Sequence, residues 1–427
     1  MFATLRNAWK IPELRKKLLF TLLVLLIYRL GNCVPVPYVN ATALAEYFTQ
    51  NLSNTVLGLY NAMSGSAFSQ ATVFALGIQP YINASIIIEL LTIAIPALER
   101  LAKDGGEEGK KKIQQITRYT TIGLGLLMGF AYFVMLKNYN TQFNLLTSTS
   151  FMTGVVIVLS FTAGASFLMW MGEQIDEFGI GNGISMILFA GIVARIPALA
   201  NNLISMAPWY VPVLIVLGML AIVIFIVFIT NSERRIPVQY AKRVVGRKMY
   251  GGQNTFLPIK VNMSGVLPII FAQSIASLPA TIIAFTGTGS SSFWNWMNTY
   301  VFDNKSVVYM VCYFFLIIAF SYFYATIQFN PIEIANNLKK NGGFIPGFRP
   351  GKPTSDFILK VINKITLFGA LYLAIIALLP IIVGVVIGNQ NLGIGGTSVI
   401  IVVGVARETV KAMEAQMLMR HYKGFLE

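Results

Sequence analysis

Two short stretches decide the fold, Gly77-Ile-Gln-Pro-Tyr-Ile82 and Gly265-Val-Leu-Pro-Ile-Ile270. Both read Gly-x-x-Pro-x-Ile, and each lies in the second apolar span of a five-span half of the chain. A second pair of motifs, Gly179-Ile-Gly181 and Gly393-Ile-Gly395, is predicted to open the fifth span of each half. A duplication with an odd number of spans per half inserts its two copies in opposite orientations, which is the inverted repeat common among transport proteins.

The composition excludes a soluble fold, because 56% of the 427 residues are hydrophobic and only 11% are charged. Apolar stretches of about 20 residues recur along the chain, and each is long enough as a helix to cross a hydrocarbon core of about 30 Å. The ten spans predicted in this way are residues 18–37, 71–95, 119–136, 151–171, 182–200, 210–230, 263–286, 306–327, 365–387 and 396–412. The sequence therefore predicts an all-α polytopic membrane protein, with ten transmembrane helices in two inverted halves, residues 1–204 and 205–427.

The distribution of positive charge predicts how the spans are oriented. The connections that hold 28 of the 32 Lys and Arg residues are residues 1–20, 99–118, 231–262, 327–364 and 404–427. These connections alternate along the chain, so the positive-inside rule places them and both termini in the cytoplasm. Lys137 and Lys305 are then isolated basic residues on the opposite face. Arg29, near the outer end of the first span, is expected to extend its side chain to the interface.

Two of the basic connections, residues 231–262 and 327–364, are longer than simple helix connections need to be. They combine basic residues with Gly, Pro and aromatic residues, and we predict that they are docking surfaces. The candidate contacts with acidic protein or phosphate are Arg234, Arg235, Lys242, Arg243 and Arg349. A basic loop also satisfies the positive-inside rule by itself, so a purely topological role stays open.

A further irregular segment, residues 57–68, lies between the first two spans and is half-apolar and broken by Gly and Ser. It is too short to cross a bilayer as a helix, so it must lie at the interface or re-enter a cavity lined by protein. Gly and Pro near the span ends also mark broken backbone, which is tolerated where it lines a water-filled path.

Aliphatic residues follow these breaks in the backbone. They are Ile78, Ile82, Ile184, Leu188, Ile270 and Ile401. A ring of branched aliphatic side chains would close a path by dewetting and would yield by rotamer changes, without binding any particular solute. Ordinary packing within a helix bundle is the alternative interpretation of the same residues.

Small polar side chains continue the aliphatic stripes on the second and seventh spans, at helical spacing. They are Ser85 and Glu89 on the second span and Gln273, Ser274 and Ser277 on the seventh. Such a face is costly to present to hydrocarbon unless the two helices meet there. The contact could be a permanent one or a gate that opens.

The chemistry of other function classes is missing. A proton- or ion-coupled transporter needs titratable groups near the midplane of its spans, which are nearly empty of them. The sequence has no cluster with metal-ligand spacing, its single histidine is His421 in the tail, and Gly179-Ile-Gly-Asn-Gly183 opens a membrane span rather than a phosphate-binding βαβ unit. Cys33 and Cys312 give no disulfide framework. We therefore expect no catalytic residue, no metal site and no cofactor.

Sequence blocks spread over nearly the whole chain carry a family resemblance. They are Phe74-Ala-Leu-Gly-Ile-Gln-Pro-Tyr-Ile-Asn-Ala-Ser-Ile-Ile-Ile88, Trp170-Met-Gly-Glu-Gln-Ile175, Gly179-Ile-Gly-Asn-Gly-Ile-Ser185, Tyr240-Ala-Lys-Arg243, Leu257-Pro-Ile-Lys-Val-Asn-Met263, Phe329-Asn-Pro331, Asn336-Asn-Leu-Lys-Lys340 and Pro346-Gly-Phe-Arg-Pro-Gly351. With these blocks in this order, the chain resembles the SecY family, the channel subunits of the bacterial protein-conducting translocon.

The resemblance implies a two-halved clamshell with a central hourglass pore, through which unfolded secretory polypeptides cross the membrane or leave sideways into lipid. It places the six aliphatic residues in the pore ring. It makes the segment around residues 57–68 the plug, in which the named candidates are Leu57, Tyr60, Met63 and Phe68. Spans two and seven, with three and eight, would form a lateral gate that signal peptides open.

The resemblance also implies partners and a location. The small SecE subunit would clamp the two halves, SecG would be peripheral, and the SecA motor or the ribosome would dock on the basic loops. The location would be the bacterial plasma membrane. Leu188 replaces an isoleucine often seen in the ring, and Glu89 stands where Gln is usual. A secondary transporter of a small solute is the alternative that the inverted repeat alone leaves open.

Overall fold

The computed structural model describes residues 2–52, 56–204, 210–240, 243–245, 248–250, 254–263, 265–286, 306–387 and 390–423. By internal packing the chain forms two units. The first contains Met1–Val213, Ser274–Tyr309 and Pro380–Glu427, and the second contains Leu214–Gln273 and Met310–Leu379. This division follows packing, whereas the predicted division into residues 1–204 and 205–427 follows the sequence repeat and stays a prediction.

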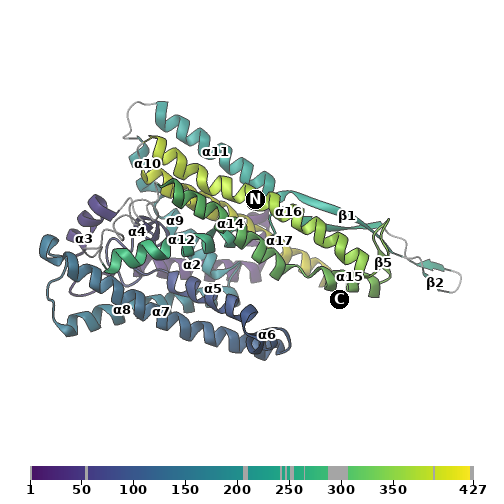
Figure 1. Ribbon diagram of the computed structural model, residues 1–427, viewed down its shortest axis with the longest axis horizontal. Helices are drawn as coiled ribbons and strands as arrows, with labels where there is room; N and C mark the ends of the chain where they lie inside the picture. Colours follow the sequence, from purple (N-terminus) through teal and green to yellow (C-terminus); the bar gives the residue numbers. More distant parts are fainter. Residues whose placement is uncertain are drawn as a thin grey trace. The chain divides into compact units, whose positions relative to one another are not determined.

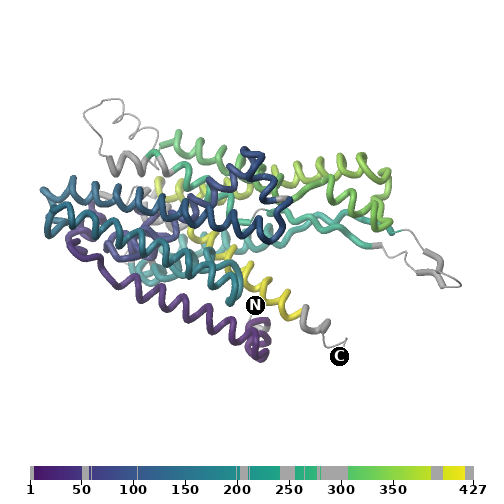
Figure 2. The backbone as a smooth tube through the Cα atoms, turned by 90° about the horizontal axis from the view of Figure 1, so that it is seen from below, coloured from purple at the N-terminus to yellow at the C-terminus, as the bar shows by residue number. Residues whose placement is uncertain are grey.

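The first unit is helical. Its helices are α1 (Phe2–Lys10), α2 (Pro12–Gly31), α3 (Ala41–Tyr47), the π-helix η1 (Phe48–Leu52), α4 (Val56–Met63), α5 (Gln79–Ala94), α6 (Pro96–Lys103), α7 (Gly106–Phe143), α8 (Phe151–Phe178), α9 (Gly183–Val193), α10 (Ile196–Ile204) and α17 (Gln390–Lys423), together with the part of α12 (Leu267–Thr286) that begins at Ser274. The long helices α7 and α8 run side by side, and α5 packs against both (Figures 1 and 2).

The second unit combines apolar helices with a small sheet. It contains most of α11 (Tyr210–Asn231), α14 (Val307–Gln328) and α16 (Lys352–Ile387), together with α15 (Pro331–Lys340) and the first residues of α12 (Leu267–Thr286). Its strands are β1 (Glu233–Tyr240), β2 (Arg243–Val245), β3 (Lys248–Tyr250), β4 (Asn254–Lys260) and β5 (Gly343–Phe344).

Each of the ten predicted spans coincides at least in part with a described helix, but several boundaries differ. The second span was predicted to begin at residue 71, whereas residues 64–78 form turns and α5 begins only at Gln79. The fifth is divided into α9 and α10. Five described helices, namely α7, α8, α11, α14 and α16, are long and apolar enough to cross a membrane, and the bent pair α5 and α6 would make a sixth. The count of ten spans stays a prediction.

Proline and glycine account for several helix boundaries. Pro96 begins α6 and biases Ile95 towards extended backbone, so α5 ends there and the two helices meet at a bend of 105°. In the two Gly-x-x-Pro-x-Ile stretches, Gly77 and Gly265 both adopt left-handed backbone, with φ of 57° and 64°. This shared local structure supports the predicted duplication. The other motif pair differs, because Gly181 lies in a bend with φ of 83° whereas residues 393–395 are helical within α17.

The basic connections contain strands that the all-α prediction did not include. Strands β4, β1 and β5 form an antiparallel sheet in that order, and Figure 1 shows β5 beside β1 near α15. Ile236 pairs with Leu257, and Gln239 pairs with Phe344. The sheet therefore joins residues 231–262 to residues 327–364, although the sequence pattern predicts two separate loops.

Buried and exposed side chains alternate along β1, so one face of this sheet is buried. Ile236 and Val238 are buried, whereas Arg235 and Pro237 are exposed. The buried residues that form the core beneath the sheet are Ile236, Val238, Ile259, Ile345, Ile358 and Ile362. The alternation of apolar and other residues from Arg235 to Val238 is a strand pattern that could have predicted β1. The high content of basic residues in this segment favoured the prediction of a loop instead.

We predict that Ile259→Ala loosens the sheet formed by β4, β1 and β5. Ile259 is 2% exposed, and truncating a buried Ile costs about 2 to 5 kcal/mol of unfolding free energy. The control is Phe256→Ala on the same strand, because Phe256 is 59% exposed. Trypsin should cut the Lys- and Arg-rich residues 231–262 faster in the Ile259 variant only, and equal cleavage rates for the two variants would contradict this core.

Candidate functional site

The short helix α4 and the loop after it are buried inside the first unit. Leu57 is 1% exposed, Tyr60 and Met63 are each 6% exposed, and Phe68 is 3% exposed. The Phe68 ring packs edge-on against Tyr132 at 4.7 Å between centroids, and the Tyr132 hydroxyl donates to the Phe68 carbonyl oxygen at 2.7 Å. Of the two predicted placements, interface or protein-lined cavity, the structure shows burial within protein.

The C-terminal end of α2 holds the loop that follows α4. The Tyr28 hydroxyl and the Asn32 Nδ2 both donate to the Ser64 carbonyl oxygen, at 3.1 and 3.2 Å. Arg29, which was expected to extend to the interface, donates from Nη1 to the Gly65 carbonyl oxygen at 3.4 Å. These donors partner carbonyl groups of a non-helical segment, and sequence analysis missed them because their acceptors lie more than 30 residues away.

The same loop has an unusual backbone. Ser66 and Ala71 have φ of 74° and 44°, a left-handed conformation that non-glycine residues rarely adopt. Local hydrogen bonds fix this geometry, because the Ser69 amide donates to Asn61 Oδ1 at 2.9 Å and the Phe68 amide donates to Ser64 Oγ at 3.2 Å. The loop is therefore a defined structure and not a simple linker.

Five of the six predicted ring residues belong to the first unit. Ile78, Ile82, Leu188 and Ile401 are buried there, and Ile184 is half-buried. The sixth, Ile270, is 6% exposed and lies in the first turn of α12, within the second unit. Helix α17, which carries Ile401, packs against α4 and α9.

The structure brings candidate plug residues and candidate ring residues around one cavity. Tyr60 and Met63 from α4, Ile78 at the start of α5 and Leu188 from α9 all line it. Its volume is about 10 Å³, which is at the lower limit for a single water molecule. Gln79 donates from Nε2 to the Met63 sulfur at 3.4 Å on the same lining. Within the first unit, this space has room for at most about one water molecule.

A glycine on α9 permits this close packing. A Cβ atom at Gly191 would lie 2.3 Å from the Met63 carbonyl oxygen and 3.0 Å from the Tyr28 hydroxyl. The opposite partner is also a glycine, because a Cβ atom at Gly65 would lie 3.0 Å from the Gly191 carbonyl oxygen. Neither position tolerates a side chain unless α4 or the loop moves.

The candidate gate residues lie on α5 and α12. Ser85 and Glu89 are half-buried on α5, and Gln273 and Ser274 are buried on α12. The side chain of Ser277 lies outside the described residues. Glu89 and Ser274 both have interaction partners within the protein. That α5 and α12 meet at these residues stays a prediction.

The candidate docking residues of the second unit are largely exposed. Arg234 and Arg235 are exposed on β1, and Arg235 Nε lies 2.8 Å from Glu233 Oε1. Arg349 is exposed, and its carbonyl oxygen accepts a 2.8 Å hydrogen bond from the Thr354 hydroxyl in the first turn of α16. Lys242 lies outside the described residues. So does the side chain of Arg243, whose backbone is in β2.

A metal site is not evident in the part of the chain that the structure describes. Among those residues, no group of three or more His, Cys, Asp or Glu side chains could hold a metal ion. Cys33 and Cys312 are both exposed free thiols.

Comparison with known proteins gives one family and one fold. A family model described as SecY matches residues 72–410. The chain is 44% identical to the protein translocase subunit SecY of Streptomyces scabiei, over the full length of both chains. A solved protein-conducting channel matches 96% of both chains with a TM-score of 0.66 at 18% identity. Sec61 in the canine ribosome-channel complex from the endoplasmic reticulum matches 96% of both chains with a TM-score of 0.62 at 15% identity.

We predict that Gly191→Ala raises the resting ion leak of vesicles containing this protein. The added methyl group would overlap the Met63 carbonyl, so α4 must shift and the cavity beside Ile78 and Leu188 must widen. The control is Gly123→Ala on α7, where an added Cβ would have no neighbour within 4 Å. Equal leak from the two variants would show that the contact between α4 and α9 does not control the seal.

Proposed function

The chain belongs to the SecY family of protein translocase subunits, and from this premise we propose that α4 and the aliphatic residues around it seal its channel. The chain is the protein-conducting channel subunit of the general secretory translocase. It moves unfolded polypeptides across the membrane and releases hydrophobic segments sideways into lipid.

The observation that carries the proposal is the cavity of about 10 Å³ shared by Tyr60, Met63, Ile78 and Leu188. Its lining residues come from four separate segments, because Tyr28 of α2 also contributes, and they leave no room for a column of water. In the resting channel, Ile82, Ile184, Ile270 and Ile401 would complete the apolar constriction and keep it dry by dewetting. Residues 57–68 act as the plug on one side of it.

Opening then requires the plug segment to leave its site. Movement of this segment would break the hydrogen bonds from Tyr28, Arg29 and Asn32, each worth about 0.5 to 3 kcal/mol. Opening would give one buried group a hydrogen bond that it lacks in the closed state. This group is Gln79 Oε1, which has no hydrogen-bond partner among the described residues. Entry of water or of a polypeptide backbone would satisfy that oxygen. The closed state is therefore favoured by a modest free energy that a translocating chain can overcome.

The transporter alternative is not supported. A secondary transporter of a small solute needs a binding site with room for the solute. The space beside the candidate ring in the first unit holds at most about one water molecule and is lined mainly by aliphatic and aromatic side chains.

The sideways exit is proposed to lie between α5 and α12. Ser85 and Glu89 on α5 and Gln273, Ser274 and Ser277 on α12 would form the polar part of this lateral gate. An apolar signal peptide would replace these polar contacts when the helices part. Marginal polar contacts suit a gate because they hold the closed state without making it permanent.

The partners follow from the family and from the charged surface. We propose that SecE clamps the two halves, that SecG binds peripherally, and that the SecA motor or the ribosome docks on the sheet and loops that carry Arg234, Arg235, Lys242, Arg243 and Arg349. The chain itself is proposed to have no catalytic activity, so the motor or the ribosome supplies the energy. The basic connections and the positive-inside rule support a bacterial plasma membrane location with both termini in the cytoplasm.

Reconstitution tests the proposed function. Vesicles that contain the chain and SecE should import a secretory precursor when SecA and ATP are supplied, and vesicles without the chain are the control. Uptake of a small solute without precursor import would overturn the proposal and restore the transporter alternative.

For the gate, we predict that cysteines at positions 85 and 277, joined by a short crosslinker, block precursor transport and that reducing the crosslink restores it. The physical reason is that joined helices cannot part for a signal peptide. The two single-cysteine variants, treated in the same way, are the controls. Efficient crosslinking with undiminished transport and membrane insertion would show that the two helices do not separate there.

For the docking surface, we predict that Arg349→Lys weakens translocation although it conserves charge. The planar guanidinium binds a carboxylate or phosphate in a bidentate way that an ammonium group cannot reproduce. The matched control is Lys352→Arg, at a nearby exposed position. SecA-driven precursor import is the measurement, and full activity of Arg349→Lys would leave that residue only a role in topology.

A further inference from the structure

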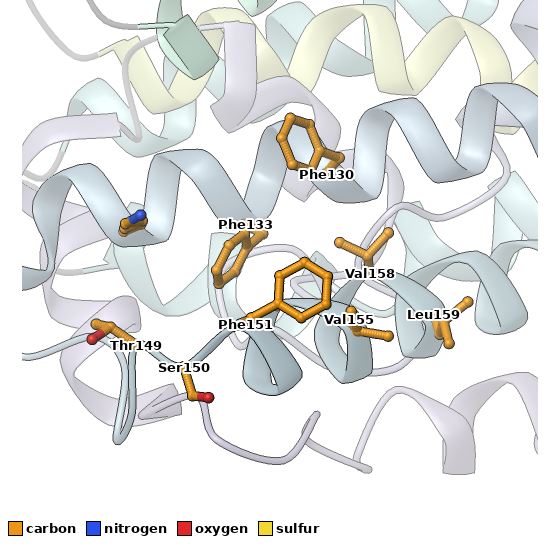
Figure 3. A pocket seen from close by; sticks show the side chains of 10 residues that line it. Phe130, Phe133, Thr149, Ser150, Phe151, Val155, Val158 and Leu159 are labelled. Carbon is orange, nitrogen blue, oxygen red and sulfur yellow. The ribbon is translucent and has the colours of Figure 1, made fainter.

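A crevice of about 410 Å³ lies where the C-terminal part of α7 faces the N-terminal part of α8. Phe130 and Phe133 from α7 and Phe151, Val155 and Val158 from α8 form its apolar lining. Figure 3 shows Thr149 and Ser150 at one end of the crevice and Leu159 at the other. The crevice is thus a long apolar slot with hydroxyl groups at one end.

The open side of this crevice faces outward from the first unit. On α7, Phe130 is 58% exposed and Leu127 is 65% exposed, and on α8, Phe151 is 84% exposed. In a membrane protein, a surface of this composition contacts acyl chains and not water. From Phe151 to Leu159 the slot extends about 12 Å along α8, by the helical rise of 1.5 Å per residue.

The one basic residue of the lining, Lys137, lies at headgroup depth. Lys112 and Lys137 are both on α7, and their separation of 25 positions corresponds to about 37 Å of helix. A hydrocarbon core is about 30 Å thick, so these two lysines reach opposite surfaces of the bilayer. Because Lys112 belongs to a basic connection, Lys137 lies in the other leaflet.

The charge of Lys137 is not compensated by the protein. Its side chain is exposed, and within the described parts of the chain it makes no ion pair. The N-terminus of α8 adds to the positive potential, because it carries the positive end of the helix dipole. Its N-cap residue Ser150 makes no side-chain cap hydrogen bond, so this side chain does not occupy the amide groups of the first turn. The hydroxyl groups of Thr149 and Ser150 line the same end of the crevice.

We propose that this crevice binds one anionic phospholipid of the leaflet opposite the basic loops. An acyl chain occupies the slot between Phe133, Val155 and Val158. The phosphate lies beside Lys137 and the start of α8. The shape and charge of the crevice match the two parts of such a lipid. The apolar slot fits an acyl chain, and the uncompensated charge of Lys137 at headgroup depth fits the phosphate. The site goes beyond the proposed function and requires only that the chain is embedded in a membrane.

Photolabelling tests the proposal. The translocase complex that contains the chain is reconstituted in phosphatidylcholine vesicles with a small fraction of phosphatidylglycerol that carries a photoreactive acyl chain. After irradiation, peptide mass spectrometry should find adducts on residues 130–137 and 150–159. Unlabelled phosphatidylglycerol should compete for these adducts, and added phosphatidylcholine should not.

Two pairs of variants distinguish a built site from general lipid contact. Lys137→Gln should lower the labelling about fivefold, whereas Lys137→Arg should retain it. Val158→Trp should fill the slot and lower the labelling, whereas Leu127→Trp, on the exposed face outside the slot, should not. Precursor import measured on the same vesicles separates this proposal from the proposed function, because either activity can be lost without the other.

Two results would overturn the proposal. Equal labelling by photoreactive phosphatidylcholine, unchanged in Lys137→Gln, would mean that the crevice contacts only bulk lipid. Labelling of the isolated chain that disappears in the assembled complex would mean that a helix of a partner subunit occupies the crevice.

Discussion

The need to partner every backbone polar group inside a membrane protein is the constraint on which the rest of this structure depends. Residues 64–78 form turns and lack the hydrogen bonds of a continuous helix, so their carbonyl groups need donors from elsewhere. Tyr28, Arg29 and Asn32 on α2 supply donors to Ser64 and Gly65, and Tyr132 on α7 supplies one to Phe68. These contacts fix α4 and the start of α5 relative to each other. The small cavity between them exists because of this arrangement.

Glycine makes the same arrangement sterically possible. Gly191 and Gly65 let α9 approach the loop within backbone contact, and Gly77 adopts the left-handed turn that leads into α5. Large aromatic side chains then fill the space around α4, with Tyr132 between Phe68 and Phe161. The result combines rigid surroundings with a short segment that is held by a few hydrogen bonds. A channel that must close tightly and still open needs both properties.

The second unit solves a different problem, which is how to give long basic loops a defined shape. Its sheet pairs β1 with β4 and β5, and Ile236, Ile259 and Ile358 anchor it to the first turns of α16. Charged residues such as Arg234 and Arg349 can then stay exposed on an ordered surface. A loop held in this way has an ordered backbone, so the loop itself loses less conformational entropy when a partner binds.

The sequence by itself determined the membrane class, the mostly helical fold and the family, because hydropathy, Gly-x-x-Pro-x-Ile motifs and short sequence blocks are local patterns. Its assignments of plug and ring residues stay predictions. It misplaced the start of the second span and overlooked the strands in the basic loop. Only the tertiary structure decided that Tyr60 and Met63 share a cavity with Ile78 and Leu188, and that Lys137 ends an apolar crevice. Such contacts join residues far apart in the chain, and their geometry depends on how whole helices pack, which no local pattern encodes.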